Sequence, residues 1–70
     1  MIKFENKENG RFYYLNVKKD LFDEWVLVVI RGGRYTSLVR TYGFNCLYSI
    51  QNEINRITHI RIKRGYTLVS

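Results

Sequence analysis

The chain has 70 residues, with 12 lysine or arginine side chains against six aspartate or glutamate, and its formal net charge is +6. This length leaves room for one domain, residues 1–70, with a small core. The single cysteine, Cys46, excludes a disulfide framework and is typical of a reducing compartment. No apolar run reaches about 18 residues, and the first residues lack the apolar core of a signal peptide. We therefore expect a soluble, cytoplasmic protein.

The positive charge is concentrated in the second part of the sequence. Residues 1–24 carry five basic and five acidic side chains, whereas residues 25–70 carry seven basic side chains against Glu53 alone. Such an asymmetry suits a surface that contacts a polyanion. It is equally typical of a basic protein whose charge serves solubility alone.

The N-terminal third is predicted to form two strands. Residues 1–4 could add a short strand, residues 6–10 are rich in turn-forming side chains, and residues 11–17 read as a longer strand. In the connection that follows, Leu21 and Phe22 are expected to pack over the end of the next strand.

Residues 25–30 are predicted to be the central strand, because they are rich in Val and Ile and too few to span a membrane. Both of its faces are apolar, with Trp25, Leu27 and Val29 on one and Val26, Val28 and Ile30 on the other. A curled sheet with a helix across its concave face would cover both. Gly32 and Gly33 follow, and we expect them to supply the positive φ of a hairpin turn.

A return strand over residues 34–42 is predicted next, and Gly43-Phe44-Asn45 is expected to break it. A short edge strand over residues 66–69 closes the sequence. With the helix that lies between them, these elements predict an α+β domain. Its curled antiparallel sheet has about four strands and packs on one C-terminal amphipathic helix, with a short final strand.

The helix is predicted from a stripe at spacings of three and four, formed by Leu47, Ile50, Ile54, Ile57 and Arg61. Asn45 or Cys46 would start the helix, and Asn45 is the better N-cap because its side chain can accept a hydrogen bond from the first unpaired amides. At the other end, Arg61, Lys63 and Arg64 suit the helix dipole, and Gly65 can take the left-handed position that ends the helix.

The residues needed for catalysis are lacking. His59 is the only histidine, and on one helix it would lie about 19 Å from Cys46, far beyond hydrogen-bond reach. One Cys and one His make no zinc spacing, and the glycine pair leads into a strand, unlike a phosphate-binding loop. We expect no enzyme activity, no metal and no cofactor.

Several segments, taken in order, resemble the WGR domain, a small module of poly(ADP-ribose) polymerases and of many bacterial proteins. The resemblance covers almost the whole chain. The matching segments are Arg11-Phe12-Tyr13, Leu21-Phe22 with Trp25 and Leu27-Val28, Phe44 with Leu47, and Arg61-Ile62-Lys63-Arg64-Gly65-Tyr66. At the motif that gives the family its name, this chain reads Arg31-Gly32-Gly33-Arg34, so the tryptophan is replaced by arginine and the arginine is displaced by one position.

The resemblance implies a module that binds DNA, since the WGR domain of the polymerases grips the end of a DNA break. The missing motif tryptophan argues against specific recognition of a DNA end, but the positive charge of the motif region is retained. Our first hypothesis is therefore a small nucleic-acid-binding module, for DNA rather than RNA, that contacts mainly the phosphate backbone. The candidate binding residues are Arg31, Arg34, Arg40, Lys63, Arg64 and Tyr35.

Each candidate also has a purely structural interpretation. Turn arginines can serve solubility, and Arg40 can be a polar outward residue of its strand. Lys63 and Arg64 can serve the helix dipole, and a core or cross-strand role is favoured for Tyr35 over stacking on a sugar or base. The alternative function is a protein–protein interaction adaptor without nucleic-acid binding, which an exposed apolar patch around Phe12 and Tyr14 would support. The chain could be a monomer or a weak dimer formed through an edge strand.

Overall fold

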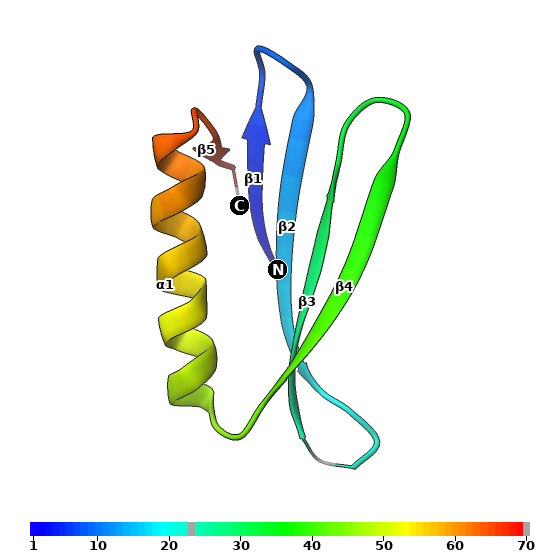
Figure 1. Ribbon diagram of the computed structural model, residues 1–70, viewed down its shortest axis with the longest axis vertical. Helices are drawn as coiled ribbons and strands as arrows, with labels where there is room; N and C mark the ends of the chain where they lie inside the picture. Colours follow the sequence, from blue (N-terminus) through cyan, green and yellow to red (C-terminus); the bar gives the residue numbers. More distant parts are fainter. Residues whose placement is uncertain (23, 70) are drawn as a thin grey trace.

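Five strands and one helix make up the fold of the computed structural model, which describes residues 1–22 and 24–69. In chain order they are β1 (Ile2–Asn6), β2 (Arg11–Lys19), β3 (Trp25–Gly32), β4 (Ser37–Phe44), α1 (Leu47–Lys63) and β5 (Thr67–Leu68) (Figure 1). The strands form one antiparallel sheet in the order β4-β3-β2-β1-β5. This confirms the predicted α+β architecture.

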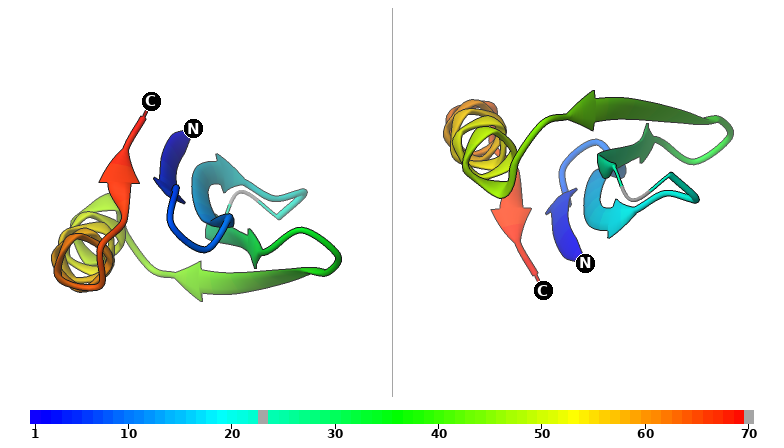
Figure 2. Two further views of the ribbon diagram at one scale, coloured as in Figure 1. Left: turned by 90° about the horizontal axis from the view of Figure 1, so that it is seen from above. Right: turned by 90° about the horizontal axis from the view of Figure 1, so that it is seen from below.

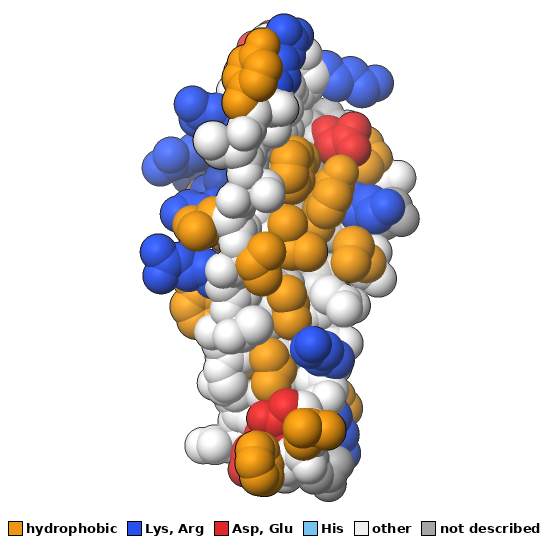
Figure 3. All heavy atoms as spheres, turned by 90° about the vertical axis from the view of Figure 1, so that its right-hand side faces the viewer, with side chains coloured by type: hydrophobic (Ala, Val, Ile, Leu, Met, Phe, Trp, Pro, Cys, Tyr) orange, Lys and Arg blue, Asp and Glu red, His pale blue; other side chains and the backbone are white. Residues whose placement is uncertain are grey.

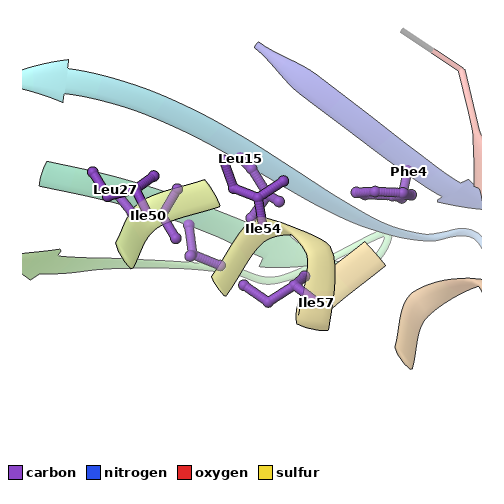
Figure 4. Packing of buried hydrophobic residues seen from close by; sticks show 7 residues of the cluster. Phe4, Leu15, Leu27, Ile50, Ile54 and Ile57 are labelled. Carbon is purple, nitrogen blue, oxygen red and sulfur yellow. The ribbon is translucent and has the colours of Figure 1, made fainter. Parts of the chain in front are cut away.

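The sheet is curled, and α1 lies on its inner side (Figure 2). The core between them consists of Phe4, Leu15, Leu27, Val29, Ile50, Ile54 and Ile57. The strand register explains the sheet's share of this core, because Leu15 pairs with Val29 and lies on the face that also carries Leu27. Figure 4 shows the three isoleucines of α1 pointing toward the strands. Each fully buried side chain of this size stabilises the fold by about 1.5–3 kcal/mol.

The apolar stripe of the helix was predicted correctly except at its first position. Leu47 is 52% exposed, whereas Ile50, Ile54 and Ile57 are buried.

The outer face of β3 is covered less than its composition suggested: Val26, Val28 and Ile30 are half-buried. Hydrophobic side chains form a band along the side of the molecule that faces away from α1 (Figure 3).

The ends of β4 lie later in the sequence than predicted. The strand runs over Ser37–Phe44, so Gly43-Phe44-Asn45 does not break it at Gly43. The reason is strand pairing: Gly43 faces Val26, and Phe44 faces Trp25. Pairing along the full length of β3 outweighs the low intrinsic preference of glycine for strands.

Two further local expectations differ from the structure. Of the two candidate helix starts, Cys46 is the N-cap of α1, in an extended conformation and without a side-chain capping hydrogen bond, so the preference for Asn45 was wrong. Leu21 and Phe22 do not pack over the end of β3, because they are 99% and 84% exposed. Instead the carboxylate of Asp20 organises this connection, accepting hydrogen bonds from the backbone N–H groups of Phe22 and Glu24 at 2.9 and 3.0 Å.

The glycines at the β3–β4 turn have a different role from the one predicted. Positive φ is found at Gly10 (74°) and Gly65 (88°), and not at Gly32 or Gly33. Gly32 is required for space: a Cβ there would overlap the carbonyl oxygen of Thr36 and lie 2.8 Å from Cα of Ser37. Gly65 follows the end of α1 in the left-handed conformation, as predicted.

Candidate functional site

A basic cleft of about 620 Å³ lies between the C-terminal end of α1 and the β3–β4 turn. It is lined by Arg11, Phe12, Tyr13, Arg31, Gly32, Gly33, Thr36, Ser37, Leu38, Arg61, Arg64 and Tyr66. Four of these twelve residues are arginines, and among the described residues that line the cleft none is acidic. The cleft therefore concentrates positive charge that is not neutralised locally.

Strand register brings the arginines of the sheet to this cleft. Tyr13 of β2 pairs with Arg31 of β3, and both lie on the face that carries Leu15 and Val29. Arg11 is two residues before Tyr13 and shares its face. Because side chains alternate between the two faces along each strand, Arg11 and Arg31 lie on the face of the sheet that packs on α1. They come after the last apolar positions of that face and border the cleft.

The end of α1 supplies the opposite wall. Gly65 reverses the chain, and the N–H of Tyr66 donates a hydrogen bond to the carbonyl oxygen of Arg61 at 3.0 Å. This turn places Tyr66 and Arg64 beside Arg61 at the cleft. The sheet and the helix end thus contribute two arginines each.

Arg61 is held between aromatic rings. Its guanidinium carbon lies 4.6 Å from the ring centre of Tyr13 and 5.2 Å from that of Tyr66. Its Nε is buried and has no hydrogen-bond partner among the described residues. Cation–π contacts of this kind contribute about 0.5–2 kcal/mol. The two rings hold the guanidinium beside the cleft, where its N–H groups can donate hydrogen bonds to an anionic oxygen.

Asn6 ties the β1–β2 connection to the helix end. It is 7% exposed, and its Oδ1 accepts a hydrogen bond from the N–H of Glu8 at 3.0 Å. Its Nδ2 donates to the carbonyl oxygen of Arg64 at 3.4 Å. A buried amide whose two ends are both engaged fixes the backbone at Arg64. Asn6 is thus a positioning residue for the cleft.

Of the six predicted site residues, the structure brings Arg31 and Arg64 together in the cleft. The other four do not line it. Arg34 lies against the β1–β2 turn, where a Cβ on Gly10 would be 3.4 Å from its Nε. Arg40 is exposed on β4 opposite Val29, and Lys63 is exposed at the last position of α1.

Tyr35 corrects a structural expectation. It is 93% exposed in the β3–β4 turn, so the core or cross-strand role favoured for it is wrong. It is available to a ligand near the rim of the cleft but does not line it.

Sequence reasoning missed Arg11, Arg61 and the two tyrosines beside Arg61 as parts of one site. Arg61 carried the clearest signal, since a charged residue continues the apolar stripe of the helix. Tyr13 and Tyr66 are half-buried, and they pack against the core while also lining the cleft. Arg11 had no signal of its own.

The outer face of the sheet is a second surface feature. The rings of Phe12 and Tyr14 lie 4.8 Å apart there, and Val39 is 60% exposed. The hydroxyl of Tyr14 donates to Oε2 of Glu5 at 3.3 Å. Partial burial, together with this carboxylate, raises the pKa of Tyr14. Phe12 and Tyr14 are half-buried, so of these three hydrophobic residues only Val39 is exposed.

The remaining reactive side chains are dispersed. Cys46 and His59 are both exposed, and a hydrogen bond with Ser49 lowers the pKa of the Cys46 thiol. In the described part of the chain, no three His, Cys, Asp or Glu side chains are grouped so as to hold a metal ion. Within residues 1–22 and 24–69, no helix is long and apolar enough to cross a membrane.

Comparison with known proteins found no matching family model, no matching curated protein and no matching solved structure. The WGR resemblance is therefore still a prediction, based on the segments quoted above.

Proposed function

We propose that this protein is a small nucleic-acid-binding module that holds the phosphate backbone of DNA in the basic cleft. The observation that carries the proposal is the convergence of Arg11, Arg31, Arg61 and Arg64 on one cleft, whose described lining residues include no acidic side chain. These arginines are separated by up to 53 positions along the chain, so the concentration of charge is a property of the fold.

The chemistry of the lining favours contacts to phosphate over contacts to base edges. Besides the arginines, its polar side chains are the hydroxyls of Thr36, Ser37 and the tyrosines, all of which suit phosphate oxygens. Asparagine and glutamine, the usual readers of adenine, do not occur among the described residues that line it. Tyr13 and Tyr66 hold Arg61 in place, which reduces the entropy lost on binding. The preference for DNA over RNA comes from the WGR resemblance.

The direct test is fluorescence anisotropy with blunt duplex, 5′-phosphorylated duplex, single-stranded DNA and RNA of one sequence, across a salt series. We expect affinity for DNA to fall steeply with salt, with a log–log slope of about −0.9 for each phosphate contacted on duplex. Arg31→Glu combined with Arg64→Glu should weaken binding at least about tenfold and reduce the slope by about one per lost contact.

The matched control is Lys7→Glu combined with Lys18→Glu. Both lysines are exposed and lie outside the cleft, and this pair lowers the net charge by the same amount. Equal weakening by the two double variants would show that total charge matters and the cleft does not. No binding to any oligonucleotide at low salt would refute the proposal.

The outer face of the sheet supports the second candidate function, a protein–protein interaction adaptor. The half-buried Phe12 and Tyr14 and the exposed Val39 would meet an apolar surface on a partner domain. This function is favoured if the chain binds no nucleic acid and if Tyr14→Ser, which removes a ring from that face without touching the lining of the cleft, abolishes recruitment of the partner while the fold is retained.

A further inference from the structure

The outer edge of β4 is an unusually open pairing surface. β4 ends the sheet, and its residues from Ser37 to Gly43 are all exposed. The edge carries no proline or lysine, and its register with β3 runs without a bulge from Gly32–Ser37 to Trp25–Phe44. Prolines, charged side chains and bulges are the usual devices that prevent edge pairing. Arg40 is the only charged residue on this strand.

The hydrogen-bond pattern shows which backbone groups point outward. The N–H of Gly33 donates to the carbonyl oxygen of Thr36 at 2.9 Å, and these two residues continue the β3–β4 register. Hydrogen-bonded pairs alternate along an antiparallel ladder, so the next ones on β4 fall at Leu38, Arg40, Tyr42 and Phe44. The N–H and C=O groups of the residues between them point away from β3. These outward residues are Ser37, Val39, Thr41 and Gly43.

We propose that this edge pairs with β4 of a second copy of the chain, antiparallel, about a two-fold axis at Thr41. Outward residues must face outward residues, which leaves few registers. Two registers pair most of the strand: one has its two-fold axis at Arg40 and the other has it at Thr41. An axis at Arg40 sets the two arginines directly opposite each other, which is unfavourable.

The register centred on Thr41 gives complementary side-chain pairs. Arg40 faces Tyr42 of the second copy twice, a cation–aromatic pair, and Leu38 faces Phe44. On the other face of the sheet, Val39 lies opposite Gly43 and Thr41 lies opposite itself. Leu38, Val39 and Tyr42 are 40%, 60% and 48% exposed in the single chain, so this pairing would cover apolar surface. About six backbone hydrogen bonds would form between the copies.

The pairing joins the two sheets into one and places both α1 helices on the same side of it, because the two-fold axis is perpendicular to the sheet. Both basic clefts then lie on that side. The inference does not depend on the proposed function, since it follows from the edge strand alone.

Disulfide trapping tests the register. In a Cys46→Ser background, Thr41→Cys puts the two new thiols in a pair whose Cα atoms are about 5.5 Å apart, within disulfide range. In the same register, Val39→Cys puts its thiols about 14 Å apart along the strands. We expect oxidised dimer from Thr41→Cys and none from Val39→Cys. Trapping through Val39→Cys with none through Thr41→Cys would overturn the register.

Sedimentation equilibrium of the full chain, from about 1 µM to about 1 mM, tests the association itself. We expect a dimer fraction that rises with concentration, is abolished by Thr41→Pro and is retained by Thr41→Val. Proline removes an outward N–H and leaves the β3 ladder intact. Should Thr41→Pro unfold, Tyr42→Arg places two like-charged pairs across the axis and should weaken association at least about tenfold. A monomer throughout this range, or a dimer insensitive to Tyr42→Arg, refutes the proposal.

Discussion

Replacing Gly32 by alanine should destabilise the protein through a steric clash with its own backbone. The new Cβ would overlap the carbonyl oxygen of Thr36 and lie 2.8 Å from Cα of Ser37. Both neighbours are main-chain atoms of the β3–β4 hairpin, so neither can move aside as a flexible side chain would. Since φ of Gly32 is not positive, left-handed backbone strain does not contribute, and the effect isolates the clash.

The magnitude follows from the cost of forced overpacking, about 1–3 kcal/mol. Alanine also restricts the unfolded chain relative to glycine, which returns about 0.4–1 kcal/mol where the site can accept it. We expect a net loss of about 1–2 kcal/mol. For a domain of this length, each kcal/mol corresponds to about 4–8 °C in the melting temperature. The midpoint should therefore fall by roughly 4–16 °C.

Thermal and urea unfolding followed by circular dichroism, at low protein concentration, would measure this loss. Gly33→Ala is the matched control, because a Cβ there would meet only Cγ of Arg11 at 3.8 Å, an ordinary contact. Gly43→Ala is a second control, with no atom within 4 Å of its Cβ. Both should change stability by less than about 0.5–1 kcal/mol. If Gly32→Ala were as stable as Gly33→Ala, the steric explanation for glycine at position 32 would be wrong.

Three other perturbations follow from the same structure. Ile50→Ala should lower the free energy of unfolding in urea by about 2–5 kcal/mol, because Ile50 is 1% exposed. Leu47→Ala, at a residue that is 52% exposed, should lower it by less than about 0.5 kcal/mol, and equal losses would contradict the core assignment. Gly65→Ala should lower the melting temperature through a cost of about 1–2 kcal/mol, because φ is 88° there, and an unchanged midpoint would contradict the left-handed helix end. Two hydrogen bonds from Arg56 (2.8 and 2.6 Å) lower the pKa of Glu53. The ionised Glu53 therefore stabilises the fold above its unfolded pKa of about 4.3, and this stabilisation is lost as pH falls through the lower folded pKa. Between pH 7 and pH 3, the melting temperature of Glu53→Gln should therefore fall less than that of the unmodified protein. Parallel plots of melting temperature against pH for the two proteins would show that the Glu53–Arg56 pair does not contribute to stability.

Much of the fold could be predicted because it is encoded in local patterns. The alternation of Trp25 to Ile30 and the spacing of Ile50, Ile54 and Ile57 identify a strand and a helix within short windows. Gly65 marks the end of the helix, because few other residues adopt its conformation. These signals, taken together, predicted the fold class and the helix face that is buried.

Element boundaries and turn chemistry were less accessible. β4 extends through Gly43 because β3 continues to pair with it, and no local signal reports the length of a partner strand. The need for glycine at position 32 arises from the approach of Thr36, a contact that exists only once the hairpin has formed. A local signal can also mislead: Leu21 and Phe22 are hydrophobic and were expected to be buried, but both are exposed.

By itself, the sequence determined that this chain is a basic α+β domain with an arginine-flanked turn and an amphipathic helix ending in cations. Only the tertiary structure decided which cations meet. Arg31 and Arg64 were predicted site residues, but Arg11 and Arg61 join them because the β2–β3 register and the position of the helix end bring distant segments together. Charge can be counted along a chain, whereas the field in a cleft depends on distances in space, and these are set by packing.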